Sequence, residues 1–233
     1  DNNSSCNEVP DLLIKGALGT SNSTSVLGNI EITRKSIQDV SLACNSSLSK
    51  CRPGSTLNIG YEVHEFEGDF DFSKLVVDGY CKLDVSISMS SRSVGINPQQ
   101  SEQNFFNYTM LNLCEALPNE SVEFAANPQF VHSLNQSNFN ALNVVNPDND
   151  SLVFSLKPAL ANRNVSITYE NGRNSDMPFA YFCQSSGVPP CPVNLLGNLV
   201  EGFYCSKTNG DIAFTPTQTN QGGVVVVECE EWK

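Results

Sequence analysis

Tyr80-Cys-Lys-Leu-Asp-Val-Ser-Ile-Ser-Met-Ser90 is the stretch that decides the fold class. Its apolar residues occupy the odd-numbered positions from Cys81 to Met89, and polar residues occupy the even-numbered positions from Lys82 to Ser90. Successive side chains of a β-strand point to opposite faces of a sheet. The alternation therefore predicts a half-buried strand whose inner face carries Cys81.

The same two-residue period recurs on both sides of this stretch, at 40–44 and at 57–63. Further short strands are expected at 12–18, 28–33, 121–125, 128–134, 151–156, 164–170, 178–183, 201–208, 211–216 and 223–230. Asn209-Gly210 separates two apolar stretches, and Asn-Gly readily takes the positive φ angles of a tight hairpin. We therefore expect an all-β, disulfide-braced, β-sandwich-like architecture.

Residues 105–117 fit either a helix that ends before Pro118 or a strand. On a helix Asn107 would share a face with apolar residues, whereas on a strand Asn107 and Thr109 face out and Phe106, Tyr108 and Met110 face in. Asn107 begins a glycosylation sequon, and a bulky glycan needs an outward side chain. Glycosylation of Asn107 would therefore favour the strand.

Composition divides the chain into two parts. Residues 96–104 are polar and contain Pro98, which is typical of a linker. The sequence therefore predicts an N-terminal β domain at 1–95, a linker at 96–104 and a C-terminal β domain at 105–233.

Asn-x-Ser/Thr sequons are unusually frequent, with nine in 233 residues against about four expected by chance from the composition. They begin at Asn2, Asn3, Asn22, Asn45, Asn107, Asn119, Asn135, Asn149 and Asn164. We interpret them as acceptors in a secreted or cell-surface glycoprotein, and we expect Asp1 to follow a cleaved signal peptide.

The sequons are unevenly distributed, because none begins between 46 and 106 or after Asn164. Glycans block close contact, so the C-terminal region is a candidate surface for a partner. The alternative is that its strands are simply buried, and the Val224–Val227 run in particular is typical of an interior strand.

The nine cysteines indicate disulfides rather than a zinc site, because no Cys-x-x-Cys pair occurs. Proximity and elimination suggest four pairs, namely Cys44–Cys51, Cys183–Cys191, Cys205–Cys229 and Cys81–Cys114. The odd count leaves Cys6 as an unpaired or intermolecular thiol, unless a ninth partner lies outside this chain.

The most unusual charged stretch is Glu65-Phe-Glu-Gly-Asp-Phe-Asp-Phe72, whose acids would share one face if it is extended. We favour a solvated or edge-protecting face. A calcium site is the weaker alternative, because carboxylates two apart on a strand lie roughly 7 Å apart in a line, whereas calcium needs converging oxygens. Its candidate ligands are Glu65, Glu67, Asp69 and Asp71. The change in apolar parity before this stretch predicts a bulge near His64–Glu65.

A second oxygen-rich stretch, Asn146-Pro-Asp-Asn-Asp-Ser151, contains the sequon at Asn149. It lacks the Gly and Glu positions of a helix-loop-helix calcium loop. We therefore interpret it as a glycosylated surface turn.

Catalytic motifs are absent from the sequence. It has no Gly-x-Ser-x-Gly and no phosphate-binding glycine loop, and its two histidines, His64 and His132, do not form a metal motif. A net charge of −12 and a pI of about 4.5 disfavour nucleic acid and anionic membranes as partners. No apolar run, Val224–Val227 included, approaches the length of a membrane segment.

These features predict a non-enzymatic protein without a cofactor, located outside the cell or on its surface. Its expected role is adhesion or extracellular assembly, through a protein partner or through self-association. The alternative is a soluble extracellular binding module for a carbohydrate or small ligand, assisted by calcium at 65–71. Tyr80, Tyr181 and Tyr204 are its candidate platforms, although each could equally pack in the core.

Overall fold

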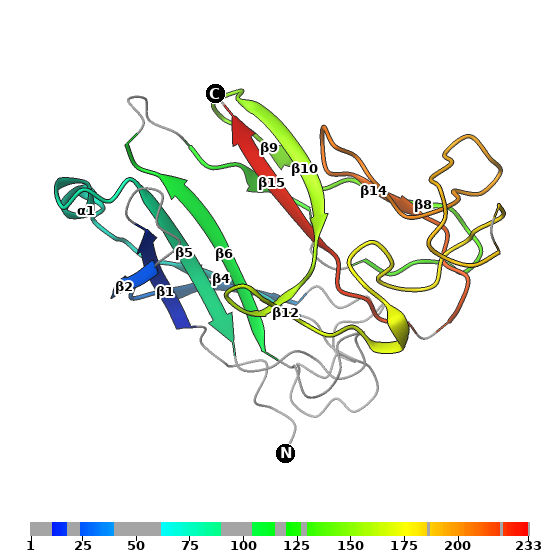
Figure 1. Ribbon diagram of the computed structural model, residues 1–233, viewed down its shortest axis with the longest axis horizontal. Coiled ribbons are helices and arrows are strands. Elements are labelled where there is room, and N and C mark those ends of the chain that lie inside the picture. The colour runs from blue at the N-terminus through cyan, green and yellow to red at the C-terminus, as the bar shows by residue number, and fades with distance from the viewer. Residues whose placement is uncertain are drawn as a thin grey trace, which may run out of the picture. The chain divides into compact units, whose positions relative to one another are not determined.

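Figure 1 shows a computed structural model of the chain. The structure describes residues 11–17, 24–39, 62–89, 104–114, 120–126, 130–185, 187–219 and 221–232. Within these residues the protein is all-β, apart from one short helix and one 3₁₀ turn. The chain forms two compact units: the first holds the described residues up to Met89 together with 104–114, and the second holds those from Glu120 onward.

The first unit is built on antiparallel strands around β5 (Lys82–Met89). Strand β5 lies between β1 (Asp11–Ala17) and β6 (Phe105–Asn112), and β2 (Thr24–Asn29) pairs with the other edge of β1. The strand predicted from 80–90 is therefore an interior strand of this sheet (Figure 1).

Residues 105–112 are a strand, which settles the alternative between helix and strand. Asn107 and Thr109 are exposed and Phe106 is buried, as the strand alternative predicted. Met110, however, was expected to face inward and is 64% exposed.

The prediction that the even-numbered residues of β5 form a solvent-exposed face is wrong. Asp84 and Ser86 belong to the even-numbered polar set, yet both are buried. The register explains this for the serines, because Ser86 pairs with Tyr108 and Ser88 with Phe106. Residues directly opposite each other on paired strands share a face, so aromatic side chains of β6 flank the small serines of β5.

The apolar face of β5 contributes Leu83, which is fully buried and packs with Leu75. Leu75 lies on the helix α1 (Ser73–Val77), which begins where Asp71 Oδ1 accepts a hydrogen bond of 2.9 Å from the Ser73 amide. An aspartate at this position satisfies an amide that the first helical turn leaves without a partner.

The predicted disulfide Cys81–Cys114 is present, with a Cα–Cα distance of 4.9 Å. It lies just outside the last paired residues of β5 and β6, where the Leu113 amide donates to the Cys81 carbonyl over 2.7 Å. The bridge therefore ties together two strands that are already in register.

Strands β3 (Thr33–Asp39) and β4 (Glu62–Glu67) form a separate antiparallel pair. The register shifts between Arg34 and Ser36, opposite Glu65 and Phe66. An irregularity was predicted near His64–Glu65, and it lies at that place in the pair but on the partner strand.

The second unit consists of short antiparallel pairs. Its strands are β7 (Glu123–Phe124), β8 (Asn138–Asn140), β9 (Val144–Val145), β10 (Ser151–Lys157), β11 (Leu160–Asn162), β12 (Val165–Ser166), β13 (Tyr204–Cys205), β14 (Ile212–Phe214) and β15 (Val226–Trp232). β10 pairs with β15, β7 with β9 and β11 with β12, while β14 lies between β13 and β8. The expected strands at 128–134 and 178–183 do not form among the described residues; an isolated bridge, Tyr181–Pro216, occurs in the latter.

The run Val224–Val227 alternates between two apolar clusters of the second unit. Val224 and Val226 pack against the cluster of Ala159, Ile167 and Tyr169. Val225 and Val227 pack against a second cluster, formed by Tyr181, Cys183, Phe203, Ile212 and Phe214. The run was expected to be an interior strand; it does contact core residues on both faces, but its four valines are only half-buried and the strand begins at Val226.

The predicted hairpin at Asn209-Gly210 joins β13 to β14. Only Gly210 takes a positive φ, at 73°, and Asn209 does not. A Cβ atom added to Gly210 would lie 2.8 Å from both Leu142 and Phe154 side chains. Glycine is needed here for the backbone conformation and for the close approach of the core.

The predicted division at 105 differs from the structure. Strand β6 (Phe105–Asn112) pairs with β5 and belongs to the first unit, so that unit takes residues from both sides of the predicted linker. Of the linker at 96–104, only Asn104 lies within the described residues. Composition identified a polar connection, but β-pairing across it decides the membership of the strand.

The substitution Gly210→Ala tests the close packing at this turn. We expect it to lower the free energy of unfolding by about 2–4 kcal/mol, because it adds a left-handed backbone penalty and overpacks the core. Gly172→Ala is the matched control, since Gly172 also has a positive φ, at 70°, but open space around its Cα.

The control should cost about 1 kcal/mol, measured for both variants by urea denaturation. Equal losses for the two variants would contradict the packing argument at Gly210.

Candidate functional site

The second unit contains an uncharged apolar segment that the sequence analysis did not single out. From Met177 to Val200 the chain carries no charged residue. Within it, the segment 187–200 is here called the apolar loop. It contains Cys191 of the predicted disulfide Cys183–Cys191, which is present with a Cα–Cα distance of 5.8 Å. The lack of charged residues in this stretch is the feature of the sequence that could have identified the loop.

Several aliphatic side chains of the apolar loop project into solvent. Leu196 is 97% exposed and Val188 is 68% exposed. Val193 and Leu195 are also exposed. These side chains lie in a region without sequons, and they are not part of a buried strand.

Glu201 fixes the base of the apolar loop. Its Oε1 accepts hydrogen bonds from the amide and the hydroxyl of Ser185, at 2.7 and 2.6 Å. Its backbone exchanges two hydrogen bonds of 3.0 Å with Asn194. The hydrogen bonds from Ser185 hold the pKa of the Glu201 carboxyl below its ordinary value. Nothing in the sequence around Glu201 marks this role.

Backbone contacts also bring the two arms of the apolar loop close together. The Leu196 amide donates to Asn194 Oδ1 over 3.0 Å, which forms a local turn at the tip. Gly202 has a φ of 81°, and an added Cβ there would lie 3.1 Å from the Val193 Cα. The two arms of the loop therefore approach closely, and the exposed leucines stand on a braced base.

A groove lies over one face of the three strands β13, β14 and β8. In the register, Ala213 pairs with Tyr204 on one side and with Phe139 on the other, so these three side chains share a face. The groove has a volume of about 270 Å³. We call it the β14 groove; its lining includes Tyr204, Ser206, Asn209, Asp211, Ala213 and Phe139.

Asp211 forms the polar end of the β14 groove. Its Oδ2 accepts a hydrogen bond of 2.7 Å from Asn209 Nδ2, and its Oδ1 accepts one of 3.2 Å from the Leu142 amide. The Asp211 amide in turn donates to Asn209 Oδ1. The turn of the hairpin thus positions the carboxylate.

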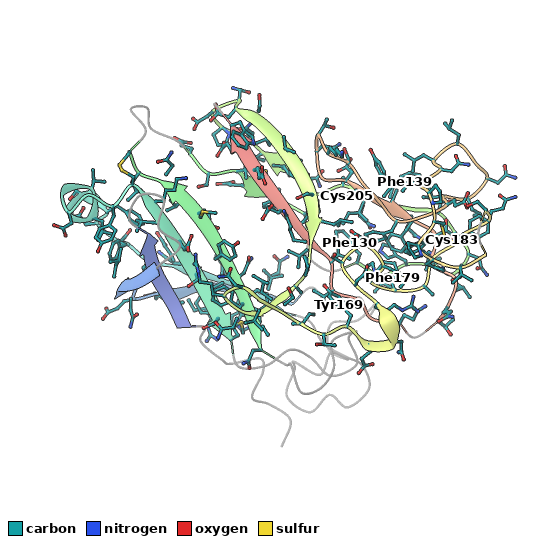
Figure 2. The ribbon with its side chains drawn as sticks, in the orientation of Figure 1. Phe130, Phe139, Tyr169, Phe179, Cys183 and Cys205 are labelled. Carbon is teal, nitrogen blue, oxygen red and sulfur yellow. A yellow bond between two sulfur atoms is a disulfide. The ribbon has the colours of Figure 1, made fainter. Side chains whose placement is uncertain are left out.

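Phe139 is the most unusual residue of this groove. It is 71% exposed, whereas its neighbour Asn140 is buried. Figure 2 shows Phe139 projecting from β8 away from the core residue Phe179. Strand β8 therefore turns its apolar side chain outward and its amide inward, against the usual pattern of a core strand.

The opposite face of β8 is structural. Asn140 Nδ2 lies 3.5 Å from His132 Nε2, and the His132 ring meets Phe214 edge-on at 4.7 Å between centroids. Burial lowers the pKa of the His132 imidazole. His132 thus packs against the core, and His64 lies beside Phe66 on β4 with ring centroids 6.3 Å apart.

The three candidate tyrosines have different environments. Tyr181 is buried in the aromatic cluster, and Tyr80 packs against the cluster of Leu75 and Leu83. Tyr204 instead lines the β14 groove.

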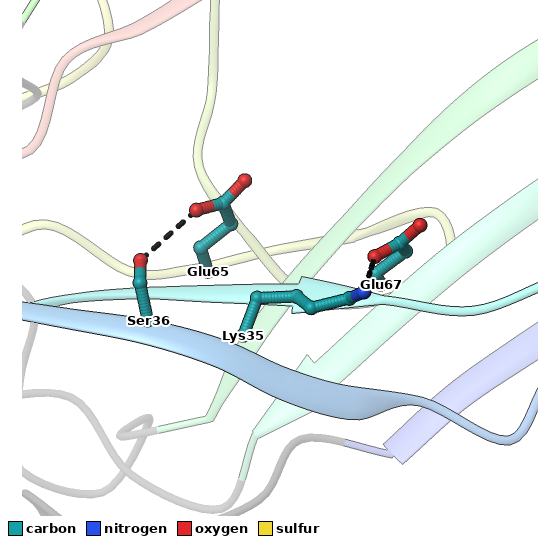
Figure 3. Close-up of polar contacts among 4 residues, drawn as sticks. All are labelled: Lys35, Ser36, Glu65 and Glu67. Carbon is teal, nitrogen blue, oxygen red and sulfur yellow. Dashed lines mark hydrogen bonds and ion pairs between the residues drawn. The ribbon is translucent and has the colours of Figure 1, made fainter.

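The predicted acidic face resolves into separate pairs (Figure 3). Glu65 accepts a hydrogen bond of 2.9 Å from the Ser36 hydroxyl, and Glu67 forms an ion pair with Lys35. Asp71 caps α1, and Asp69 is exposed. In the part of the chain that the structure describes, no three His, Cys, Asp or Glu side chains gather where they could hold a metal ion.

Four sequon asparagines lie within the described residues, namely Asn107, Asn135, Asn149 and Asn164, and all four are exposed. Three of them, Asn135, Asn149 and Asn164, have positive φ angles between 54° and 59°. Their side chains are therefore presented on turns. The sequons at Asn2, Asn3, Asn22, Asn45 and Asn119 lie outside the described residues.

The predicted pair Cys205–Cys229 is wrong, because both residues are free thiols. Cys229 pairs with Phe154 of β10, and the Phe154 amide donates to Lys207 on the other side. Strand β10 thus lies between Cys229 and the segment at Lys207, which are about two strand spacings or roughly 9.6 Å apart, whereas a disulfide spans about 7 Å at most. Burial raises the pKa of both thiols. Cys6, Cys44 and Cys51 lie outside the described residues.

Comparison of the chain with protein-family models, with curated proteins and with solved structures gives no match. Among the described residues, no helix is long and apolar enough to cross a membrane.

The contacts of Glu201 predict a dependence of stability on pH. Because its pKa is lower in the folded protein, Glu201 contributes stability that is fully present above its unfolded value, near 4.5. That contribution is lost as the pH falls through the folded value. Glu201→Gln should therefore show a smaller loss of unfolding free energy than the parent protein between pH 6 and pH 3.

Urea denaturation at a series of pH values measures this difference. Identical pH profiles for the two proteins would contradict a native role for the Glu201–Ser185 contact.

Proposed function

We propose that this chain is a secreted or cell-surface N-glycosylated protein with a non-enzymatic role in adhesion or extracellular assembly. In this proposal the apolar loop, residues 187–200, contacts the protein partner. The observation that carries the proposal is the exposure of Leu196 on a loop braced by a disulfide. Val188, Val193 and Leu195 of the same loop are exposed as well, and a group of exposed apolar side chains marks an interaction site more often than a single one does.

Sequon placement supports the location of the contact. The four described sequon asparagines are exposed, and the last sequon of the chain begins at Asn164. The apolar loop therefore carries no acceptor for a glycan. A glycan-free loop leaves its aliphatic side chains open to a partner surface.

Rigidity supports a recognition role for the loop. The Cys183–Cys191 bridge and the hydrogen bonds of Glu201 hold its base in one arrangement. A loop that is ordered before binding loses less conformational entropy when a partner binds. Because the loop has no charge, its affinity would come from apolar burial and would change little with salt.

The disulfides support an extracellular location. Two bridges are present among the described residues, and stable disulfides are typical of oxidising compartments. The excess of sequons points to the same compartment.

The double variant Leu195→Ser/Leu196→Ser tests this proposal. The full glycosylated chain should self-associate or bind the surface of cells from its source, and the variant should do so at least 10-fold more weakly. Analytical ultracentrifugation measures self-association, and flow cytometry with fluorescently labelled protein measures cell binding. Both side chains are exposed, so the variant should keep the parent melting temperature.

Val131→Ser is the matched control, because Val131 is also exposed but lies outside the apolar loop. Its binding should equal that of the parent protein. A strictly monomeric parent that binds no cells, or equal binding by the double variant, would overturn the proposal.

A further inference from the structure

We propose that the β14 groove binds a neutral saccharide, with one sugar ring held against Phe139 and Tyr204 and its hydroxyl groups directed at Asp211. This site is independent of the apolar loop and of the proposed contact with a protein partner. The inference depends on three properties of the groove, namely its aromatic walls, its small floor and its polar end.

The aromatic walls follow from the register of the three strands. Tyr204 and Phe139 both pair with Ala213, so one aromatic side chain stands on each side of a methyl group. The two residues are two strand spacings apart, about 9.6 Å at the backbone. Both aromatic side chains line the groove, whereas Ala213 between them is 3% exposed and forms its floor.

The exposure of Phe139 needs an explanation that packing does not provide. Strand β8 buries the amide of Asn140 and exposes the ring of Phe139. Burying the phenyl ring instead would gain about 2–3 kcal/mol, so the observed orientation sacrifices stability. Departures from core patterning of this kind are expected where a surface serves a ligand.

The polar end provides acceptors for hydroxyl groups. Each oxygen of Asp211 accepts one hydrogen bond, from Leu142 or from Asn209. A carboxylate has about four acceptor positions, so about two stay open toward the groove. Two neighbouring hydroxyl groups of a sugar fit a carboxylate in this way, and hydrogen bonds to a charged acceptor are the stronger kind.

The charge of the lining indicates a neutral ligand. The residues that line the β14 groove include Asp211 and no Lys or Arg, and the chain has a net charge of −12. Anionic ligands would therefore be repelled. A cation could also lie between aromatic rings and a carboxylate, and a cationic probe in the test below separates the two ligands. A sugar ring is apolar on its faces and polar at its edge, so it matches both the aromatic walls and the carboxylate of Asp211.

Two sources could supply such a saccharide. One is a free or partner-borne glycan, and the other is a glycan of this chain, because the sequon residue Asn135 lies three positions before β8 (Asn138–Asn140). The chemistry of recognition is the same for both sources, and the Asn135→Gln variant separates them.

The test uses the full chain and a panel of neutral probes, the methyl glycosides and short oligomers of glucose, mannose, galactose and N-acetylglucosamine. Isothermal titration and saturation-transfer NMR should detect binding of at least one probe. Phe139→Ala should weaken that binding at least 10-fold, and Asp211→Asn at least 5-fold. Ring protons of the bound sugar should shift upfield in the parent protein and not in Phe139→Ala.

Phe124→Ala is the matched control, because Phe124 is an exposed phenylalanine outside the groove lining. Its affinity for the sugar should equal that of the parent. If Asn135→Gln binds the probes more tightly than the parent, a glycan of this chain occupies the groove; if it binds them equally, the saccharide comes from outside.

Binding of tetramethylammonium in place of every sugar would overturn the proposal, and so would sugar binding that Phe139→Ala leaves unchanged. Failure of the apolar-loop variants to alter cell binding would not bear on this site, because they leave the groove intact.

Discussion

The second unit depends on the packing of the half-buried run Val224–Val227 against apolar residues on both sides. Alternate valines contact two different apolar clusters, so this short run is the wall that the two clusters share. The strand that continues it, β15, pairs with β10 and thereby places Phe154 in the interior. Phe154 in turn lies against the turn at Gly210, where no larger residue fits. Core packing therefore positions the hairpin that carries Asp211. Because Asp211 forms the polar end of the β14 groove, core packing positions that end as well.

The two surface features are held in different ways. The base of the apolar loop is held by a covalent bridge and by the hydrogen bonds of Glu201. The β14 groove instead belongs to a sheet whose opposite face carries buried Asn140 and Phe214, against which His132 packs. Both arrangements leave apolar side chains in water, which a protein of marginal stability tolerates only at a limited number of positions. A braced loop and a sheet face can each present such side chains without moving them.

Local pattern was sufficient for some elements and failed for others for a definable reason. The alternation in 80–90 predicted β5, and sequence proximity predicted the Cys183–Cys191 bridge. The two-residue period shows which residues of one strand share a face. It does not show which residues of two neighbouring strands lie opposite each other. In the first unit the register pairs Ser86 with Tyr108, so the faces predicted to be inward on β5 and β6 lie on opposite sides of the sheet. The same lack of register produced the incorrect pair Cys205–Cys229, because proximity in sequence ignores the intervening strand β10.

The sequence by itself determined the all-β class, the sequons and the uncharged stretch from Met177 to Val200, because these depend on residue types and their spacing along the chain. Tyr204 was also a candidate from sequence, but only the tertiary structure distinguished it from Tyr80 and Tyr181. The groove, the exposure of Phe139 and the support of the loop by Glu201 were decided by tertiary structure alone. Each requires residues distant in sequence to meet at a defined register, and register is fixed by the packing of the whole unit rather than by any local pattern.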